Sequence, residues 1–246
     1  MKGKVLILTG DGINCEQETA RAFQRAGGFT HFVHVNELLK DPQALLSYSV
    51  FALPGGFSFG DELRSGKILA EKLRKNLLPS LNEFQRRGGM TFGICNGFQV
   101  LMQLGVFFEA SIPSATLATN DHGNFLDFWT ECELTKDAML SPWFKGMAGT
   151  FSLPVRHKEG RVCVRESNRL HDLRIPIAYR TPINGSFKNA AAMMDQSGRT
   201  LGLMPHPEAA LSGFLNPLNM SDEEKFSNAK NILQLFINAV ETEVNQ

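Results

Sequence analysis

A short motif, Gly93-Ile94-Cys95-Asn96-Gly97, constrains this chain of 246 residues more than any other feature. It follows an apolar run and precedes a segment with helical spacing. Glycines on both sides of the cysteine allow a tight strand-to-helix turn, in which the side chain stands exposed above a sheet. The start of the following helix would favour the thiolate of Cys95. Cys95 is therefore a candidate nucleophile, and the alternative is a buried cysteine of a core strand.

Strands and helices alternate over the first hundred residues. Continuous apolar runs predict buried strands at 5–9, 29–35, 50–53 and 90–94. Helical spacing predicts helices at 16–26, 68–77, 79–87 and 96–104, several of which end at glycine. This alternation favours a parallel sheet with helices on both of its faces.

The second half of the chain has shorter apolar runs. They predict strands at 129–134, 150–155, 161–165, 189–195 and 200–203, with a hairpin turn at 195–198. A capping box at Ser221 and Glu224 predicts the start of a final helix. We therefore expect an α/β fold, with an open, mostly parallel sheet flanked by helices and an added antiparallel strand region. No repeat or linker divides the sequence, so we expect one domain over residues 1–246.

Composition narrows the classes of function. The chain has 25 basic and 25 acidic residues, and no block of like charge indicates a nucleic-acid or membrane partner. The four cysteines (Cys15, Cys95, Cys132 and Cys163) form no C-x-x-C pair, so no metal site or disulfide framework is expected. The first apolar run is too short for a signal peptide. These features predict a cytoplasmic protein.

A cysteine nucleophile needs a base and a group that orients the base. His206-Pro207-Glu208 follows a predicted strand, and prolines flank His206. A histidine and a glutamate two residues apart on a rigid segment can point to one side, so the carboxylate can hold the imidazole. The alternative is a loop histidine beside a solvated glutamate. Of the other histidines, His122 and His157 are candidates for lining a site, whereas structural or surface roles are expected for His31, His34 and His171.

The loop 53–61 follows another strand, and such strand ends gather the sites of open α/β sheets. Its glycines Gly55 and Gly56 would let backbone N–H groups approach a substrate as an oxyanion hole. A phosphate-binding loop is an alternative, although no G-K-S/T or G-x-G-x-x-G pattern is present. The second alternative is a turn that connects two elements and has no part in a site.

Several of these motifs resemble one enzyme family. The segments 93–99 and 205–208 resemble the class I (triad) glutamine amidotransferases. Four segments (10–15, 54–61, 184–186 and 202–208) are similar to the glutaminase subunits of phosphoribosylformylglycinamidine synthase, in order along the chain from Lys4 to about Leu211. The resemblance implies a flavodoxin-like amidotransferase fold. It also implies hydrolysis of L-glutamine by a triad of Cys95, His206 and Glu208.

The same resemblance implies further roles. Backbone N–H groups of Gly56 and Asn96 would hold the oxyanion, next to Gly55, and Gln99 would contact the substrate. The segment 120–125, with Asn120 and Phe125 at its ends, would help to bind it. The ammonia would pass to a synthetase partner, with or without a small third subunit, that converts formylglycinamide ribonucleotide to the amidine in purine biosynthesis. ATP and Mg²⁺ would bind that partner, and no cofactor or metal is expected in this chain.

The sequence departs from the family pattern at three positions. Ala209 stands where an arginine usually follows H-P-E, and Asn124 and Phe128 stand where basic residues are expected. These departures concern the partner interface and leave the triad intact. Three alternatives stay open: a free-standing hydrolase of γ-glutamyl substrates, a non-catalytic regulatory relative, and a cysteine protease. Cys15, Cys132 and Cys163 receive no role.

Overall fold

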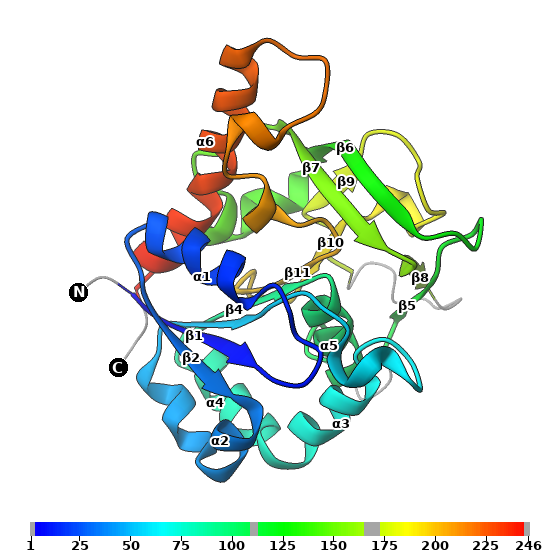
Figure 1. The fold of residues 1–246 in the computed structure, drawn as a ribbon. Coiled ribbons are helices and arrows are strands. Elements are labelled where there is room, and N and C mark those ends of the chain that lie inside the picture. The colour runs from blue at the N-terminus through cyan, green and yellow to red at the C-terminus, as the bar shows by residue number, and fades with distance from the viewer. Residues whose placement is uncertain (1–2, 109–112, 165–172, 244–246) are drawn as a thin grey trace.

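The computed structural model describes residues 3–108, 113–164 and 173–243 (Figure 1). A six-stranded sheet with the order β10-β11-β4-β3-β1-β2 forms its centre. Every neighbouring pair is parallel except β10 with β11. The strands are β1 (Lys4–Thr9), β2 (Phe29–His34), β3 (Val50–Leu53), β4 (Met90–Ile94), β10 (Ala192–Met194) and β11 (Thr200–Leu203). The central strands β3, β4 and β11 are buried along their whole length, as continuous apolar runs predict.

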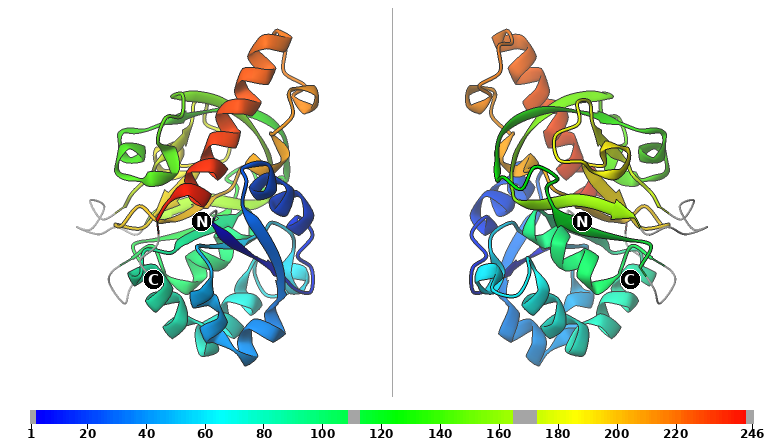
Figure 2. Two further views of the ribbon diagram at one scale, coloured as in Figure 1. Left: turned by 90° about the vertical axis from the view of Figure 1, so that its left-hand side faces the viewer. Right: turned by 90° about the vertical axis from the view of Figure 1, so that its right-hand side faces the viewer.

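Helices cover both faces of this sheet. Figure 2 shows α1 and α6 on one side and α2 to α5 on the other. Phe23 of α1, Phe92 of β4 and Phe236 of α6 meet edge to face, so both helices on that side pack on the middle of the sheet. The helices are α1 (Glu16–Arg25), α2 (Val35–Lys40), α3 (Lys67–Asn76), α4 (Leu78–Arg86), α5 (Asn96–Leu104) and α6 (Asp222–Glu241). In the described part of the chain no helix has the length and apolar character needed to cross a bilayer.

The second half of the chain adds antiparallel strands beside the sheet (Figure 1). A three-stranded sheet has the order β7-β6-β9, and β5 pairs with β8. The strands are β5 (Ala115–Thr119), β6 (Leu126–Leu134), β7 (Thr150–His157), β8 (Glu159–Val164) and β9 (Ile177–Tyr179). This arrangement confirms the predicted fold class, a mostly parallel sheet flanked by helices with an antiparallel region.

Most predicted elements are present, with shifted ends. The second strand ends at His34 because Val35 begins α2, a short helix capped by the His34 side chain and not predicted. Strands β5 and β9 were also missed, since each is too short to show a clear alternation. The capping box at Ser221 and the hairpin turn at 195–198 are confirmed. Arg165 and His171 lie outside the described residues, and the expectation of one domain stays a prediction.

Two asparagines of α6 offer a test of how this helix is held. The Asn228 side chain accepts the N–H of Ser152 at 2.7 Å and donates to its carbonyl at 3.1 Å, both buried. We expect Asn228→Ala to lower the free energy of unfolding by about 2 kcal/mol, because it leaves a buried N–H and C=O unpaired. Asn231 makes the same pair of bonds to Ala148 in a more exposed place. Asn231→Ala should cost less than about 1 kcal/mol, and equal losses in urea denaturation would contradict this ranking.

Candidate active site

Cys95 occupies a strained turn between β4 and α5. Its backbone has φ +50° and ψ −103°, a conformation that costs a non-glycine residue energy. Two hydrogen bonds hold it there, from the Cys95 N–H to the Leu203 carbonyl at 2.8 Å and from the Gln99 N–H to the Cys95 carbonyl at 3.0 Å. The side chain is buried, which differs from the exposed position expected from the turn, because the chain around Arg156 covers it and places that carbonyl oxygen 3.6 Å from Sγ.

The two flanking glycines are required by close packing. A Cβ on Gly97 would lie 1.9 Å from the carbonyl oxygen of Leu53 on β3. A Cβ on Gly93 would lie 2.8 Å from the carbonyl group of Gly97. The first turn of α5 therefore rests directly on the sheet, and this fixes the height of Cys95 above the strand ends.

His206 and Glu208 form a buried pair at the end of β11. His206 Nδ1 lies 2.6 Å from Oε1 of Glu208, and each side chain is less than a tenth exposed. The His206 N–H donates to the Pro154 carbonyl on β7 at 2.9 Å, and Pro207 begins a short 3-10 turn that carries Glu208. The carboxylate thus sets the tautomer and orientation of the ring, as the H-P-E spacing predicts.

The electrostatics of this pair favour the charged imidazole. Burial lowers the pKa of His206, but the Glu208 carboxylate, with the thiols of Cys95 and Cys15 beside the ring, outweighs burial and holds that pKa well above its usual value. Within the described residues, Nε2 of His206 and Oε2 of Glu208 are buried without a hydrogen-bond partner. Both atoms are available to a ligand or a reacting group.

The loop after β3 presents a backbone N–H group. Gly56 has φ +148°, and a Cβ there would lie 2.5 Å from the Gly12 carbonyl oxygen, so only glycine fits. The Phe57 N–H donates to Gly12 at 2.7 Å, and the Asn14 N–H donates to Gly55 at 3.2 Å. Neither bond uses the N–H of Gly56, which stays available as a donor beside the cavity described below.

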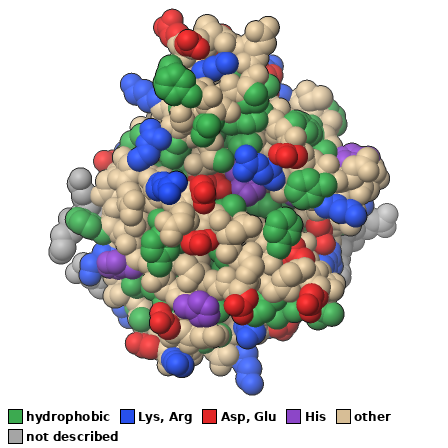
Figure 3. All heavy atoms as spheres, in the orientation of Figure 1, with side chains coloured by type: hydrophobic (Ala, Val, Ile, Leu, Met, Phe, Trp, Pro, Cys, Tyr) green, Lys and Arg blue, Asp and Glu red, His purple; other side chains and the backbone are tan. Residues whose placement is uncertain are grey.

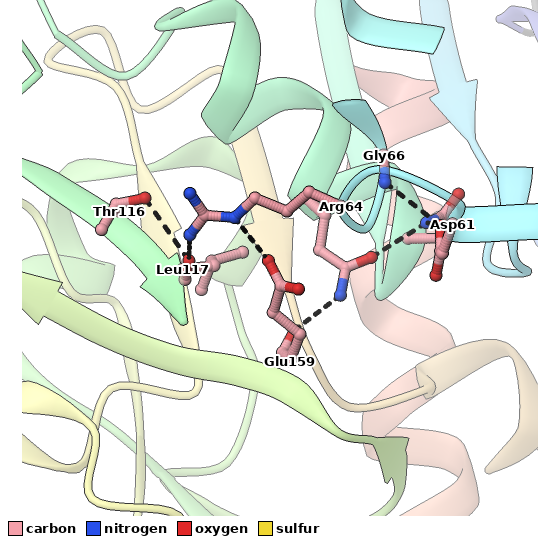
Figure 4. Close-up of polar contacts among 8 residues, drawn as sticks. Asp61, Arg64, Gly66, Thr116, Leu117 and Glu159 are labelled. Carbon is pink, nitrogen blue, oxygen red and sulfur yellow. Dashed lines mark hydrogen bonds and ion pairs between the residues drawn. The ribbon is translucent and has the colours of Figure 1, made fainter. Parts of the chain in front are cut away.

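A polar network joins this loop to α5 and to β8 (Figure 4). Asn96 Nδ2 donates to Asp61 at 3.2 Å and to Gln99 Oε1 at 2.9 Å, and Gln99 Nε2 donates to the Glu159 carbonyl at 2.6 Å. Arg64 forms an ion pair with the Glu159 carboxylate at 2.9 Å. The amide groups of Asn96 and Gln99 are thereby fixed from both sides.

A cavity of about 300 Å³ opens beside Cys95. Of the residues predicted from the sequence, Gly56, Cys95, Gln99, Phe125 and His157 line it, whereas His122 does not. The other lining residues are Phe57, Asp61, Ser65, Thr119, Arg156, Lys158 and Glu159. On the face of the molecule shown in Figure 3, acidic and basic side chains are interspersed. The cavity itself holds charges of both signs, which suits a zwitterionic ligand.

The remaining predicted residues stand beside the cavity wall. Gly55 faces the His206 ring, and Asn96 is held in the network around Asp61. Asn120 Nδ2 donates to the carbonyls of Asn124 and His157, both at 3.0 Å, so its side chain supports the turn that ends at Phe125. The structure thus brings Cys95, His206, Glu208 and the loop after β3 together, and puts Asn120 behind the cavity.

The turn that leads from β7 into β8 contributes residues that sequence reasoning mostly missed. Arg156, Lys158 and Glu159 line the cavity, and only His157 was a candidate. Burial, followed by the charges of His206 and His122, lowers the pKa of His157 to about 4, so its ring is neutral at physiological pH. A single sequence carries no signal for these positions, because they reach Cys95 only through the pairing of distant strands.

Comparisons with known proteins agree with this site. The family model of CobB/CobQ-like glutamine amidotransferase domains matches residues 2–241. The chain is 35% identical to subunit PurQ of phosphoribosylformylglycinamidine synthase from Methanococcus maripaludis, over 97% of this chain and 96% of that protein. The chain belongs to the PurQ family. PurQ from Dehalococcoides mccartyi is also 35% identical, over 97% of both chains.

A solved structure supports the same assignment. A chain in the PurLQS structure from Thermotoga maritima is 27% identical, with a TM-score of 0.73 over 95% of this chain and 98% of that chain. The resemblance inferred from the motifs is therefore confirmed. More distant amidotransferase structures, at 15% identity, share the fold.

The buried PurQ histidine predicts how stability depends on pH. The folded-state pKa of His206 is raised, so its contribution to stability is complete below about pH 6.5 and is lost as pH rises through the folded value. In Glu208→Gln the main raising charge is gone and burial dominates, so the contribution reverses and is lost as pH falls through about 6.5. We expect the gap in free energy of unfolding between the two proteins to widen from about pH 9 to pH 5.5. A constant gap in denaturation curves over this range would rule out the charged pair.

Proposed function

We propose that this PurQ-family chain is the glutaminase subunit of a phosphoribosylformylglycinamidine synthase, with Cys95, His206 and Glu208 as its catalytic triad. The observation that carries the proposal is a buried His206–Glu208 pair beside a cysteine in a strained strand-to-helix turn. The two other parts of such a site, backbone donors and an adjoining cavity, support it.

In the proposed reaction, Cys95 Sγ attacks the carboxamide carbon of L-glutamine. The N–H groups of Gly56 and Asn96 stabilise the negative charge that develops on the carbonyl oxygen. His206 gives its proton to the departing nitrogen, and ammonia leaves behind a glutamyl thioester on Cys95. His206 then takes a proton from water, which attacks the thioester, and glutamate leaves as the Cys95 thiolate is restored.

The cavity supports a substrate the size of one amino acid. Its volume of about 300 Å³ lies at the small end of ligand sites. Gln99 and Phe125 line it, and Asn120 holds the turn that carries Phe125. Asp61 and Arg156 offer charges of opposite sign to the two charged groups of a free amino acid. We assign substrate binding to these residues. Gly55 and Gly56 would lie beside the carboxamide group of the substrate, where the reaction takes place.

The proposal includes a synthetase partner. PurQ relatives are named as synthase subunits, and a similar chain belongs to the PurLQS structure of Thermotoga maritima. Ammonia released into water near neutral pH is mostly protonated, so a partner must receive it at the site. ATP and Mg²⁺ would bind that partner, and a small third subunit would complete the assembly. We place the reaction in the cytoplasm, where free thiols such as that of Cys95 stay reduced.

The role of Cys95 as nucleophile is tested by measuring synthesis from glutamine and synthesis from added ammonia separately. With the synthetase assembled, Cys95→Ala should lower glutamine-dependent synthesis by about 10⁶-fold, whereas synthesis from added ammonia should persist. His206→Ala should behave similarly, and Glu208→Gln should be milder because the base survives. Loss of both activities in an intact complex would contradict the proposed division of labour.

Glutamine hydrolysis by the chain alone and with its synthetase, ATP and nucleotide tests the partner. We expect little activity alone and strong activity in the complex. Equal activity in both would favour a free-standing γ-glutamyl hydrolase. Silence in both would favour a non-catalytic regulatory relative.

A further inference from the structure

Cys15 is a second thiol at the proposed catalytic base. It ends the segment 10–15, which packs along the oxyanion loop and leads into α1. The Cys15 N–H donates to the Gly55 carbonyl at 3.2 Å, and its own carbonyl accepts the Thr19 hydroxyl at 2.7 Å. These bonds fix the backbone on both sides of the Cys15 side chain. The reaction proposed above uses no atom of this residue.

The Cys15 thiol and the His206 ring border one small space. A Cβ on Gly55 would lie 3.3 Å from Cys15 Sγ and 2.9 Å from Cε1 of His206. Because Gly55 has no side chain, no Cβ enters the space between the Cys15 thiol and the His206 ring. Cys15 Sγ, a ring nitrogen of His206 and a carboxylate oxygen of Glu208 all lie within 4.8 Å of one another. Cys15 is partly exposed, so the group can be reached from solvent.

Three different metal-binding groups therefore converge on one point. Thiolate, imidazole and carboxylate together are typical ligands of Zn²⁺, and three protein ligands leave a fourth position for water. Tetrahedral Zn²⁺ needs ligand atoms about 3.3–3.6 Å apart, which lies within the observed limit. The Nδ1–Oε1 contact of 2.6 Å is shorter, but Oε2 of Glu208 is buried without a partner among the described residues and can turn toward an ion.

We propose that Cys15, His206 and Glu208 form an inhibitory binding site for Zn²⁺ or a similar soft divalent cation. Binding forms Zn–S, Zn–N and Zn–O bonds and releases one proton from the Cys15 thiol and one from the His206 imidazolium. Affinity therefore rises with pH. Because the Glu208 carboxylate faces Nδ1 of His206, a metal shared by the three ligands binds Nδ1 and leaves a proton on Nε2. The ring then cannot accept the proton that catalysis requires.

The rival arrangement is chelation by Cys95 and His206, which any cysteine–histidine site offers. The two differ in which sulfur binds. Both thiols have a polar neighbour, Cys95 in the Arg156 carbonyl at 3.6 Å and Cys15 in the Asn14 side-chain oxygen at 3.3 Å. Cys95 is buried, whereas Cys15 is partly exposed and lies with the Glu208 carboxylate in the same group. The proposal assigns the sulfur to Cys15.

The test titrates the full-length chain with Co²⁺ and then Zn²⁺, without glutamine. We expect one Co²⁺ per chain with a thiolate-to-cobalt charge-transfer band that Zn²⁺ removes. Cys95→Ser and the control Cys163→Ser, which alters the other partly exposed thiol, should keep the band. Cys15→Ser should lose it and weaken Zn²⁺ binding beyond the roughly 10–100-fold cost of an outer-shell change. Glu208→Gln should also weaken binding.

Thermal denaturation provides a second readout on the same proteins. Zn²⁺ should raise the Tm of the wild type and of Cys163→Ser, but not of Cys15→Ser, whose Tm without metal shows whether it folds. Loss of the band in Cys95→Ser with retention in Cys15→Ser would overturn the proposal in favour of the rival site. Absence of one-to-one binding in the wild type would also overturn it. Since no turnover is measured, these outcomes are independent of the proposed glutaminase activity.

Discussion

The close approach of α5 to β3 is the constraint on which the site depends. The Gly97 Cα can sit over the Leu53 carbonyl only because it carries no Cβ, which would lie 1.9 Å from that oxygen. The chain must then turn within one residue of β4, and this forces Cys95 to φ +50°. Hydrogen bonds to β11 and within α5 offset the strain. The position of the proposed nucleophile is thus a consequence of helix–sheet packing, and its thiol needs no contact of its own to stay in place.

The rest of the site is assembled around that fixed point by segments far apart in the sequence. Residues 12–14 hold the loop after β3, and the turn from β7 into β8 brings Arg156 and Glu159 over Cys95 and Gln99. The Arg64–Glu159 ion pair joins the loop after β3 to the antiparallel strands. As Arg64 is about two-fifths exposed, this pair orients the loop more than it stabilises the fold. The cavity therefore lies between the parallel sheet and the added strands, and neither half forms it alone.

The sequence predicted those parts of the site whose geometry depends on residues close together in the chain. The glycines around Cys95 and the H-P-E segment each encode their geometry within five residues, so the strained turn and the His206–Glu208 contact could be predicted. The capping box of α6 is local in the same way. Residues at the turn from β7 into β8 could not be predicted, because their approach to Cys95 depends on the register of β6 with β7. Cys15 was dismissed for lack of a C-x-x-C partner, and its neighbours His206 and Glu208 are close only in the folded chain.

The two buried histidines near Cys95 show how one site assigns different charge states to the same side chain. Burial alone lowers the pKa of both. His206 escapes this effect because Glu208 provides a negative charge at hydrogen-bond distance, whereas His157 has no carboxylate partner and faces the positive charge of His206. Burial, with the charged His206 ring as a second cause, thus keeps His157 neutral. A proton held at His206 stands beside the proposed nucleophile, where a departing nitrogen needs it, and the second ring cannot compete for that proton at neutral pH. Removing the Glu208 charge would therefore also remove the positive charge that opposes His157, although burial would still lower the pKa of that ring.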